Sequence, residues 1–129
     1  MIIDNIAHYL VENVETIDLT LGSNIFTAFM PDTPAEIVAV YDTGGATPDI
    51  DIPTGSPTFQ IIVRTADYEN GFNLMKEIVD LLHQKMNITL AEGGTYFYSI
   101  FLMGEAGHIG RDEKSRDEFS VNFICKTRR

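Results

Sequence analysis

The chain has 129 residues, of which 44% are hydrophobic and 22% are charged. This size and composition are typical of one ordered globular domain, and they exclude a disordered tail or a fibrous repeat. The formal net charge of −10 argues against a nucleic-acid-binding module, because such a module needs a basic surface to meet phosphates.

The acidic charge is concentrated in the first half of the chain. No Lys or Arg precedes Arg64, whereas nine acids do: Asp4, Glu12, Glu15, Asp18, Asp32, Glu36, Asp42, Asp49 and Asp51. The ten acids that follow nearly balance the nine bases of the whole chain. Two interpretations stay open, an excess that serves only solubility and an acidic surface with a function.

Nothing in the sequence predicts export or membrane insertion. The single Cys125 cannot form an internal disulfide, and it lies in an alternating apolar run where a thiol behaves as a small hydrophobe. The first residues, Met1 to Asn5, carry no basic charge, and no apolar run approaches the roughly 18 to 20 residues that span a bilayer. We therefore expect synthesis in a cytoplasm and no membrane association.

The first 41 residues predict one helix and three strands. Apolar residues spaced three and four apart predict an amphipathic helix over Ile2 to Val14. Strict alternation from Thr16 to Leu21 predicts a half-buried strand. Ile25 to Met30 is a further short strand, which ends at the prolines of Pro31 to Pro34, and Ile37 to Tyr41 is an apolar, buried strand.

From Asp42 to Pro57 the sequence reads DTGGATPDIDIPTGSP. Its glycines and prolines predict a loop of about sixteen residues, and loops of that length are usually functional or disordered. Ile50 and Ile52 flank Asp51, which predicts a short hairpin arm able to reach another subunit. Asp49 and Asp51 lack the further acidic ligands of a calcium loop, so no metal is expected there.

The second half predicts a strand over Thr58 to Thr65 and then a long helix from Tyr68 to His83, with Asp67 as its N-cap. The apolar stripe of this helix should lie on the sheet, with Phe72 and Val79 buried. Its members are Tyr68, Phe72, Met75, Val79, Leu82 and Met86, widened by Leu74, Ile78 and Leu81.

The last third predicts two strands and a turn. Thr95 to Met103 is almost wholly apolar, which predicts a central strand covered on both faces. Gly104 to Gly110 is expected to be a loop, and Arg111 to Asp117 a turn. Glu118 to Lys126 alternates and points its apolar residues inward: Phe119, Val121, Phe123 and Cys125. The fold class is therefore α+β, a mainly antiparallel sheet with an N-terminal helix and one long amphipathic helix packed on it.

No residue pattern predicts a chemical reaction. The three histidines, His8, His83 and His108, have no partner at a ligand spacing, and His83 is best interpreted as a residue near the negative end of the helix dipole. The paired glycines at 44–45 and 93–94 fit turns and no phosphate loop. The acids of Arg111 to Glu118 alternate with bases, which predicts a solvated, self-neutralising hairpin. We expect a protein that is no enzyme and has no cofactor.

Four segments occur in a fixed order along the chain: Met30–Pro34 running into Val38–Gly45, then Pro57–Arg64, then the helical Tyr68–His83, then Gly110–Lys114 leading into Glu118–Phe123. In this order and spacing, the chain from about Phe26 to Phe123 resembles the minor capsid or tail-terminator proteins that complete the tails of long-tailed bacteriophages. The resemblance implies one domain over residues 1–129 that works as a homohexameric ring. Such a ring caps the tail tube and joins it to the head connector. It also implies a place in the virion, at the tail or neck, after synthesis in a bacterial host from a phage or prophage genome.

A ring of this kind needs two different contact patches on each subunit. The two candidates are the arm, with Asp42, Gly44, Gly45, Asp49 and Asp51, and the turn, with Arg111, Asp112, Glu113, Lys114 and Arg116. The expected partners are further copies of the chain, the tail tube protein and the head connector protein. DNA would pass through the ring without specific binding, with the arm acids toward the lumen.

Two alternatives remain open from the sequence. One is another neck or tail subunit of a phage, a tail-tube or head-completion protein. The other is a small-molecule-binding or enzymatic α+β domain, with a pocket between the long helix and the sheet that Tyr96, Tyr98 and His108 line.

Overall fold

The computed structural model describes residues 2–45 and 54–128. Within these residues the chain forms two helices and one eight-stranded sheet. The elements are α1 (Ile2–Asn13), β1 (Ile25–Thr27), β2 (Ile37–Gly45), β3 (Thr54–Gly55), β4 (Pro57–Thr65), α2 (Tyr68–Leu82), β5 (Lys85–Thr89), β6 (Tyr96–Leu102), β7 (Gly107–Arg111) and β8 (Asp117–Arg128). The sheet order is β1-β2-β4-β8-β6-β5, and every pair except β1–β2 is antiparallel. The predicted α+β class is confirmed.

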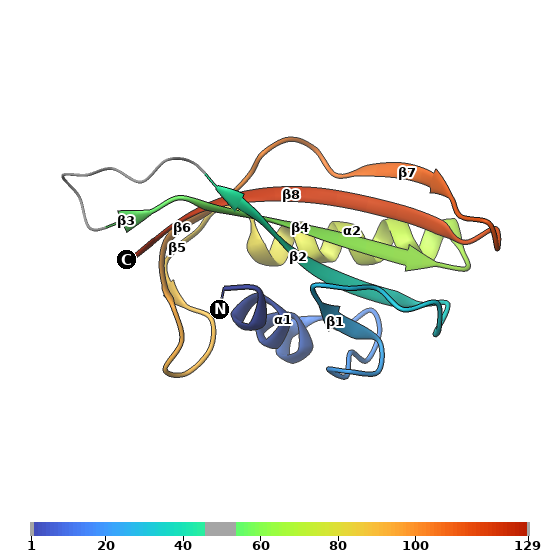
Figure 1. Ribbon diagram of the computed structural model, residues 1–129, viewed down its shortest axis with the longest axis horizontal. Coiled ribbons are helices and arrows are strands. Elements are labelled where there is room, and N and C mark those ends of the chain that lie inside the picture. Colours follow the sequence, from blue (N-terminus) through green and yellow to red (C-terminus); the bar gives the residue numbers. More distant parts are fainter. Residues whose placement is uncertain (1, 46–53, 129) are drawn as a thin grey trace.

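Strand β8 is the long central strand of the sheet, and it lies along the longest axis of the molecule (Figure 1). One of its edges pairs with β4, and the pairing continues with β3 at the C-terminal end. The other edge pairs first with β7 and then with β6. The elements at the two ends of the molecule, β3 and β7, are therefore both positioned by their pairing with β8.

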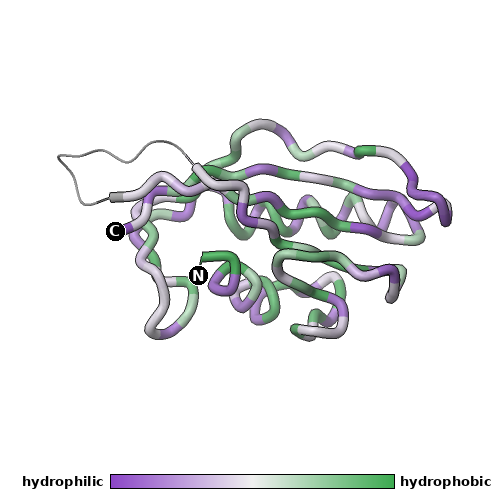
Figure 2. The backbone as a smooth tube through the Cα atoms, in the orientation of Figure 1, coloured by the Kyte–Doolittle hydropathy of each residue, from purple (hydrophilic) through white to green (hydrophobic). Residues whose placement is uncertain are grey.

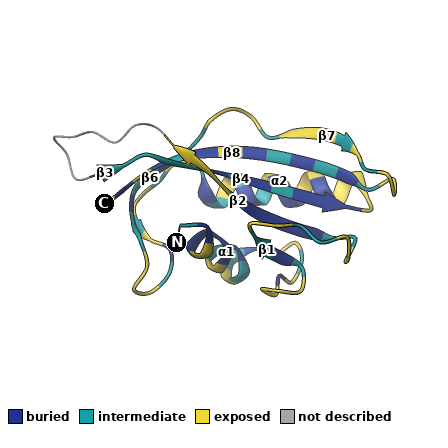
Figure 3. Ribbon diagram, in the orientation of Figure 1, coloured by how far each residue is buried: buried dark blue, intermediate teal, exposed yellow. Residues whose placement is uncertain are grey.

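The core lies on the face of the sheet that the two helices cover. Alternate residues of β4 and β8 point into it, and the buried set includes Phe59, Ile61, Val63, Phe119, Val121, Phe123 and Cys125. Figure 3 shows these two strands as the most buried part of the sheet. The inward alternation that the sequence predicts for β8 is confirmed.

Helix α2 starts as predicted, because the carboxylate of Asp67 caps it by accepting from the Glu69 N–H at 3.1 Å. Four of its five buried residues, Leu74, Met75, Ile78 and Leu82, belong to the predicted apolar stripe, but the face is rotated toward Gly71, which is also buried. Gly71 fixes this rotation, since a Cβ there would lie 2.5 Å from the Phe119 ring.

The predicted burial of Phe72 is therefore wrong, because Phe72 and Tyr68 lie on the flank of α2 and are 52% and 49% exposed. Val79 is only partly buried. Met86 is not part of the helix; it belongs to β5 and is 59% exposed.

The strand predicted over Thr16 to Leu21 is absent, apart from one isolated bridge between Leu21 and Ile25. Side chains, and no neighbouring strand, form hydrogen bonds with the backbone of this segment. The Glu77 carboxylate accepts from the N–H groups of Glu15 and Thr16 at 2.9 and 3.1 Å. Asn24 adds two more such bonds, because its side chain accepts from the Thr20 N–H and donates to the Asp18 carbonyl, so several backbone groups here are satisfied without a ladder.

In the C-terminal half of the chain, the structure differs from three further expectations. Strand β5 was not expected. Gly107–Arg111 pairs with β8 as β7, although the residues up to Gly110 were expected to be a loop and Arg111 the start of a turn. Strand β6 lies between β8 and β5 as an inner strand, but it is not covered on both faces, because only Phe97 and Ile100 are buried. These strands are held by pairing with β8 or β6, a long-range contact that local spacing does not reveal.

Candidate assembly surfaces

The predicted loop of Asp42 to Pro57 begins and ends as paired strand. Strand β2 runs on to Gly45 and β4 returns from Pro57, with Gly44 paired to Thr58 and Gly45 to Pro57. Asp42, Gly44 and Gly45 are all exposed. Asp49, Asp51 and the predicted hairpin at Ile50 and Ile52 lie outside the described residues. The described part is therefore an arm base that is paired within the sheet, at the end of the molecule where β3 lies beside β8 (Figure 1).

Gly45 is required for this pairing. Its φ is 149°, and a Cβ would lie 2.4 Å from the carbonyl oxygen of Ser56. The hydroxyls of Thr43 and Thr58 are 2.7 Å apart across the two strands. The arm base has a defined geometry before it meets any partner.

The turn between β7 and β8 lies at the other end of the molecule, in a strongly hydrophilic stretch (Figure 2). Asp112 organises it. One carboxylate oxygen accepts from the N–H groups of Lys114 and Arg116, each at 2.9 Å, and the other accepts from Arg116 Nε at 2.7 Å. The Arg116 hydrogen bond is the main reason that the pKa of Asp112 falls from 3.8 to about 2.

The same turn is tied to a segment more than eighty residues away in sequence. Arg116 Nη2 lies 2.9 Å from the Asp32 carboxylate, and Lys114 also pairs with Asp32. The Lys114 hydrogen bond is the largest cause that lowers the pKa of Asp32. The predicted self-neutralising hairpin thus has a further acidic partner, and Arg116 is not solvated, since its side chain is only 12% exposed.

Arg64 fixes the segment that carries Asp32. It is 4% exposed, and its Nη2 donates to the carbonyls of Pro31, Asp32 and Pro34 at 2.8, 3.0 and 2.7 Å. Its buried Nε has no hydrogen-bond partner. Burial lowers the pKa of Arg64. Sequence spacing gave no sign of this role, because the partners are backbone carbonyls about thirty residues away.

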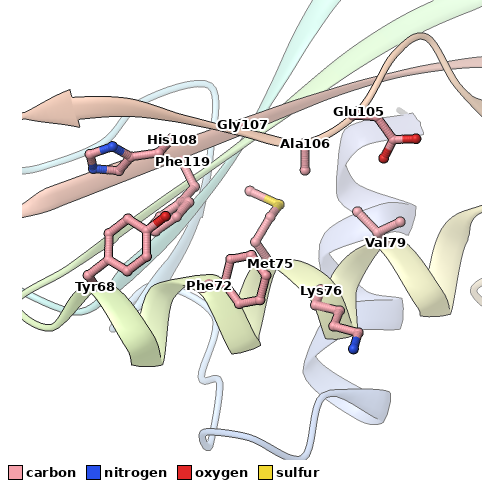
Figure 4. Close-up of a pocket in the computed structure, with 10 residues that line it drawn as sticks. All are labelled: Tyr68, Phe72, Met75, Lys76, Val79, Glu105, Ala106, Gly107, His108 and Phe119. Carbon is pink, nitrogen blue, oxygen red and sulfur yellow. The ribbon is translucent and has the colours of Figure 1, made fainter.

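A groove of about 280 Å³ lies between α2 and the stretch that leads into β7 (Figure 4). Its lining residues are Tyr68, Phe72, Met75, Lys76, Val79, Glu105, Ala106, Gly107, His108 and Phe119. The Tyr68 ring is the centre of an aromatic cluster, with centroids 5.0 Å from His108 and 5.2 Å from Phe119. Half-exposed aromatic rings line a concave surface here, and polar and apolar atoms contribute to that surface in nearly equal parts.

His108 is held at one end of this groove. Its Nε2 lies 3.0 Å from Asp117 Oδ1, and the same oxygen accepts from Arg111 Nε at 3.3 Å. The Asp117 side chain is only 3% exposed. This buried carboxylate therefore orients two side chains of the exposed edge strand β7 (Figure 3).

The predicted pocket of Tyr96, Tyr98 and His108 is not formed. Of these three residues, His108 alone lines the groove beside α2. Tyr96 and Tyr98 are on β6, whose first residues pair near the C-terminal end of β8, and Arg128 lies over the Tyr96 ring at 5.2 Å. His83 is the C-cap of α2, at the negative end of the helix as predicted, and its Nδ1 also accepts from the Leu102 N–H at 3.1 Å.

The arm base and the turn lie at opposite ends of β8. Thr54 pairs with Arg128, whereas Arg111 pairs with Asp117. Strand β8 has 12 residues, which span roughly 36 Å at about 3.3 Å per residue. The structure thus separates the two predicted contact patches.

Two classes of site find no support in the described part of the chain. No three His, Cys, Asp or Glu side chains there are grouped so that they could hold a metal ion. Neither described helix has the length and apolar character to cross a bilayer.

The comparisons with known proteins agree with this architecture. The sequence model of a family described as "Bacteriophage tail terminator protein" matches residues 14–129. A chain of a solved structure titled "Virion of native gene transfer agent (GTA) particle" has a similar fold, with a TM-score of 0.63 and 16% sequence identity over 84% of this chain and 81% of that one. No curated protein sequence gives a match. Since the family match covers nearly the whole sequence, the chain belongs to the bacteriophage tail terminator proteins, which are structural components of the phage tail.

Proposed function

We propose that this protein caps the tail tube and joins it to the head connector as a homohexameric ring. The observation that carries the proposal is the separation of two dissimilar exposed patches, the arm at one end of β8 and the β7–β8 turn at the other. A closed ring needs such heterologous contacts, in which one patch of a subunit meets a different patch of the next. The family match and the fold shared with a chain of the gene transfer agent virion support the same role.

The contact residues follow from these two patches. On the arm they are Asp42, Gly44, Gly45, Asp49 and Asp51, and on the turn they are Arg111, Asp112, Glu113, Lys114 and Arg116. The partners are neighbouring copies, the tail tube protein and the head connector protein. The protein would be encoded by a phage or prophage genome and would lie at the neck of the virion. It would catalyse no reaction there.

The acidic first half suits a DNA conduit. A wall that attracted phosphates would release counterions on contact and hold the passing DNA, whereas a wall of like charge leaves it mobile. Asp42, Asp49 and Asp51 are proposed to face the lumen. Replacing all three with Lys should slow DNA ejection from particles that still assemble, and unchanged ejection kinetics would remove these residues from the lumen.

Electron microscopy tests the role itself. Virions labelled with an antibody to this protein should carry the label at the neck, and the purified protein should form six-membered rings on the ends of tail tubes. Label on the capsid faces, or tubes that keep growing when the protein is added, would contradict the proposal. The Gly45→Val variant complements this test. Its side chain would disrupt the pairing of the arm base without changing the buried core, so the variant should fold but form no rings.

A tail-tube or head-completion role is less well supported, because the matching family is that of the terminators. A small-molecule function is also weaker. The groove beside α2 has a volume of about 280 Å³, which is below the usual range of ligand pockets, roughly 300 to 1,000 Å³.

A further inference from the structure

We infer that the groove between α2 and β7 is the surface that receives the arm of the neighbouring copy. This inference rests on the proposed ring and names the contact that closes it. The arm residues concerned are 46–53, which follow Gly45 at the end of β2 and precede Thr54 at the start of β3.

The groove has the features of a surface made for an apolar segment. Tyr68 and Phe72 are about half exposed there, although both belong to an aromatic cluster with a centroid distance of 6.5 Å between them. Ile109, on the adjacent strand β7, is 59% exposed. Aromatic grooves of this kind bind extended segments that contain proline, because such segments lose little conformational entropy on binding.

The arm carries the matching residues. Residues 46–53 read ATPDIDIP, with prolines at 48 and 53 and isoleucines at 50 and 52. In an extended chain, Ile50 and Ile52 point to one side and Asp49 and Asp51 to the other. The isoleucine side of the arm can therefore lie against the aromatic rings of the groove while the other side stays in water.

The charges are complementary at the rim. The sequence from Asp42 to Pro57 has three acids and no base. Lys76 lines the groove on the helix side, and Arg111, 65% exposed, lies on β7 beside His108. Glu105 is the one acid among the lining residues, so the rim of the groove is complementary in charge to the acidic arm as a whole.

The arm of the same chain cannot reach the end of the groove that Phe119 lines. Gly45 pairs with Pro57, whose carbonyl accepts from Cys125, and Thr54 pairs with Arg128. Phe119, at the floor of the groove, is six residues from Cys125 along β8 and nine from Arg128, or roughly 20 and 30 Å. Eight residues held at both ends reach out at most about 16 Å and return. An arm that fills the whole groove, up to Phe119, must therefore come from another copy.

Cross-linking between two variants that each carry one added cysteine tests this contact. Asp51→Cys and Lys76→Cys chains are mixed, with and without tail tubes, and treated with a short bismaleimide. The native Cys125 is buried and does not compete. Asp51→Cys mixed with Glu12→Cys, on the exposed side of α1, is the matched control.

We expect at least a tenfold higher dimer yield for the first pair than for the control pair, and a loss of this excess when Phe72→Glu is added to the Lys76→Cys chain. Far-UV circular dichroism checks that each variant is folded. Equal yields for the two pairs, both with and without tubes, overturn the inference. If wild-type rings still form on tubes in that case, only the arm–groove contact is refuted, whereas absent rings refute the proposed function.

Discussion

Arg64 should be one of the most sensitive polar positions of this fold. It is 4% exposed, and one nitrogen of its guanidinium donates to three backbone carbonyls of the segment 31–34. The Arg64→Met substitution keeps much of the aliphatic packing but removes all three hydrogen bonds. The segment 31–34 then loses its attachment to the sheet. Because Asp32 in this segment pairs with Arg116 and Lys114, the β7–β8 turn also loses a fixed partner.

The size of the effect follows from these contacts. A buried carbonyl left without a donor costs about 1 to 3 kcal/mol. Asp32 is at the surface, with a side chain 58% exposed, so part of the segment can turn its carbonyls to water. The unpartnered Nε of Arg64 and its desolvated charge also disappear. We therefore expect a net loss of roughly 2 to 3 kcal/mol.

Urea unfolding followed by circular dichroism measures this loss, with the slope of the transition expected to stay unchanged. Lys114→Met is the matched control. It removes a cation that pairs with the same Asp32, but both side chains are more than half exposed, so the loss should stay below about 1 kcal/mol. Equal losses for the two variants, or a loss below about 1 kcal/mol for Arg64→Met, would refute the proposed anchoring.

Three further outcomes are expected. Leu74→Ala should cost about 2 to 5 kcal/mol in unfolding free energy and the half-exposed Phe72→Ala only about 1 to 2; the reverse order would mean that α2 packs through Phe72. The folded-state pKa of Asp112 is about 2, below its usual 3.8, so its stabilisation is complete above about pH 4 and is lost as the pH falls through about 2. Asp112→Asn should therefore flatten the fall of melting temperature over that interval, and Glu12→Gln should not. Deletion of residues 46–53 should leave cooperative melting intact while ring assembly on tail tubes is lost; an unfolded deletion variant would show that the arm belongs to the core.

The sequence by itself determined the parts of the fold that depend on neighbouring residues. Alternation placed Phe119 to Cys125 on the core face of β8, and Asp67 was recognisable as the N-cap of α2. The order of the segments was also sufficient to indicate the family, which the match over residues 14–129 confirms. These features succeed because period and capping are local properties of the chain.

Other features were decided only by the tertiary structure. The Asp32–Arg116 pair joins residues 84 positions apart, and strand β7 exists because β8 offers it an edge. Periodicity could not fix the rotation of α2 either, because its apolar stripe is wider than the face that the sheet can cover. The helix packs with Gly71 against the Phe119 ring, where no side chain keeps the two elements apart, and this rotation leaves Phe72 exposed. A helix settles where its backbone approaches the sheet most closely, and that depends on the partner surface as well as on its own sequence.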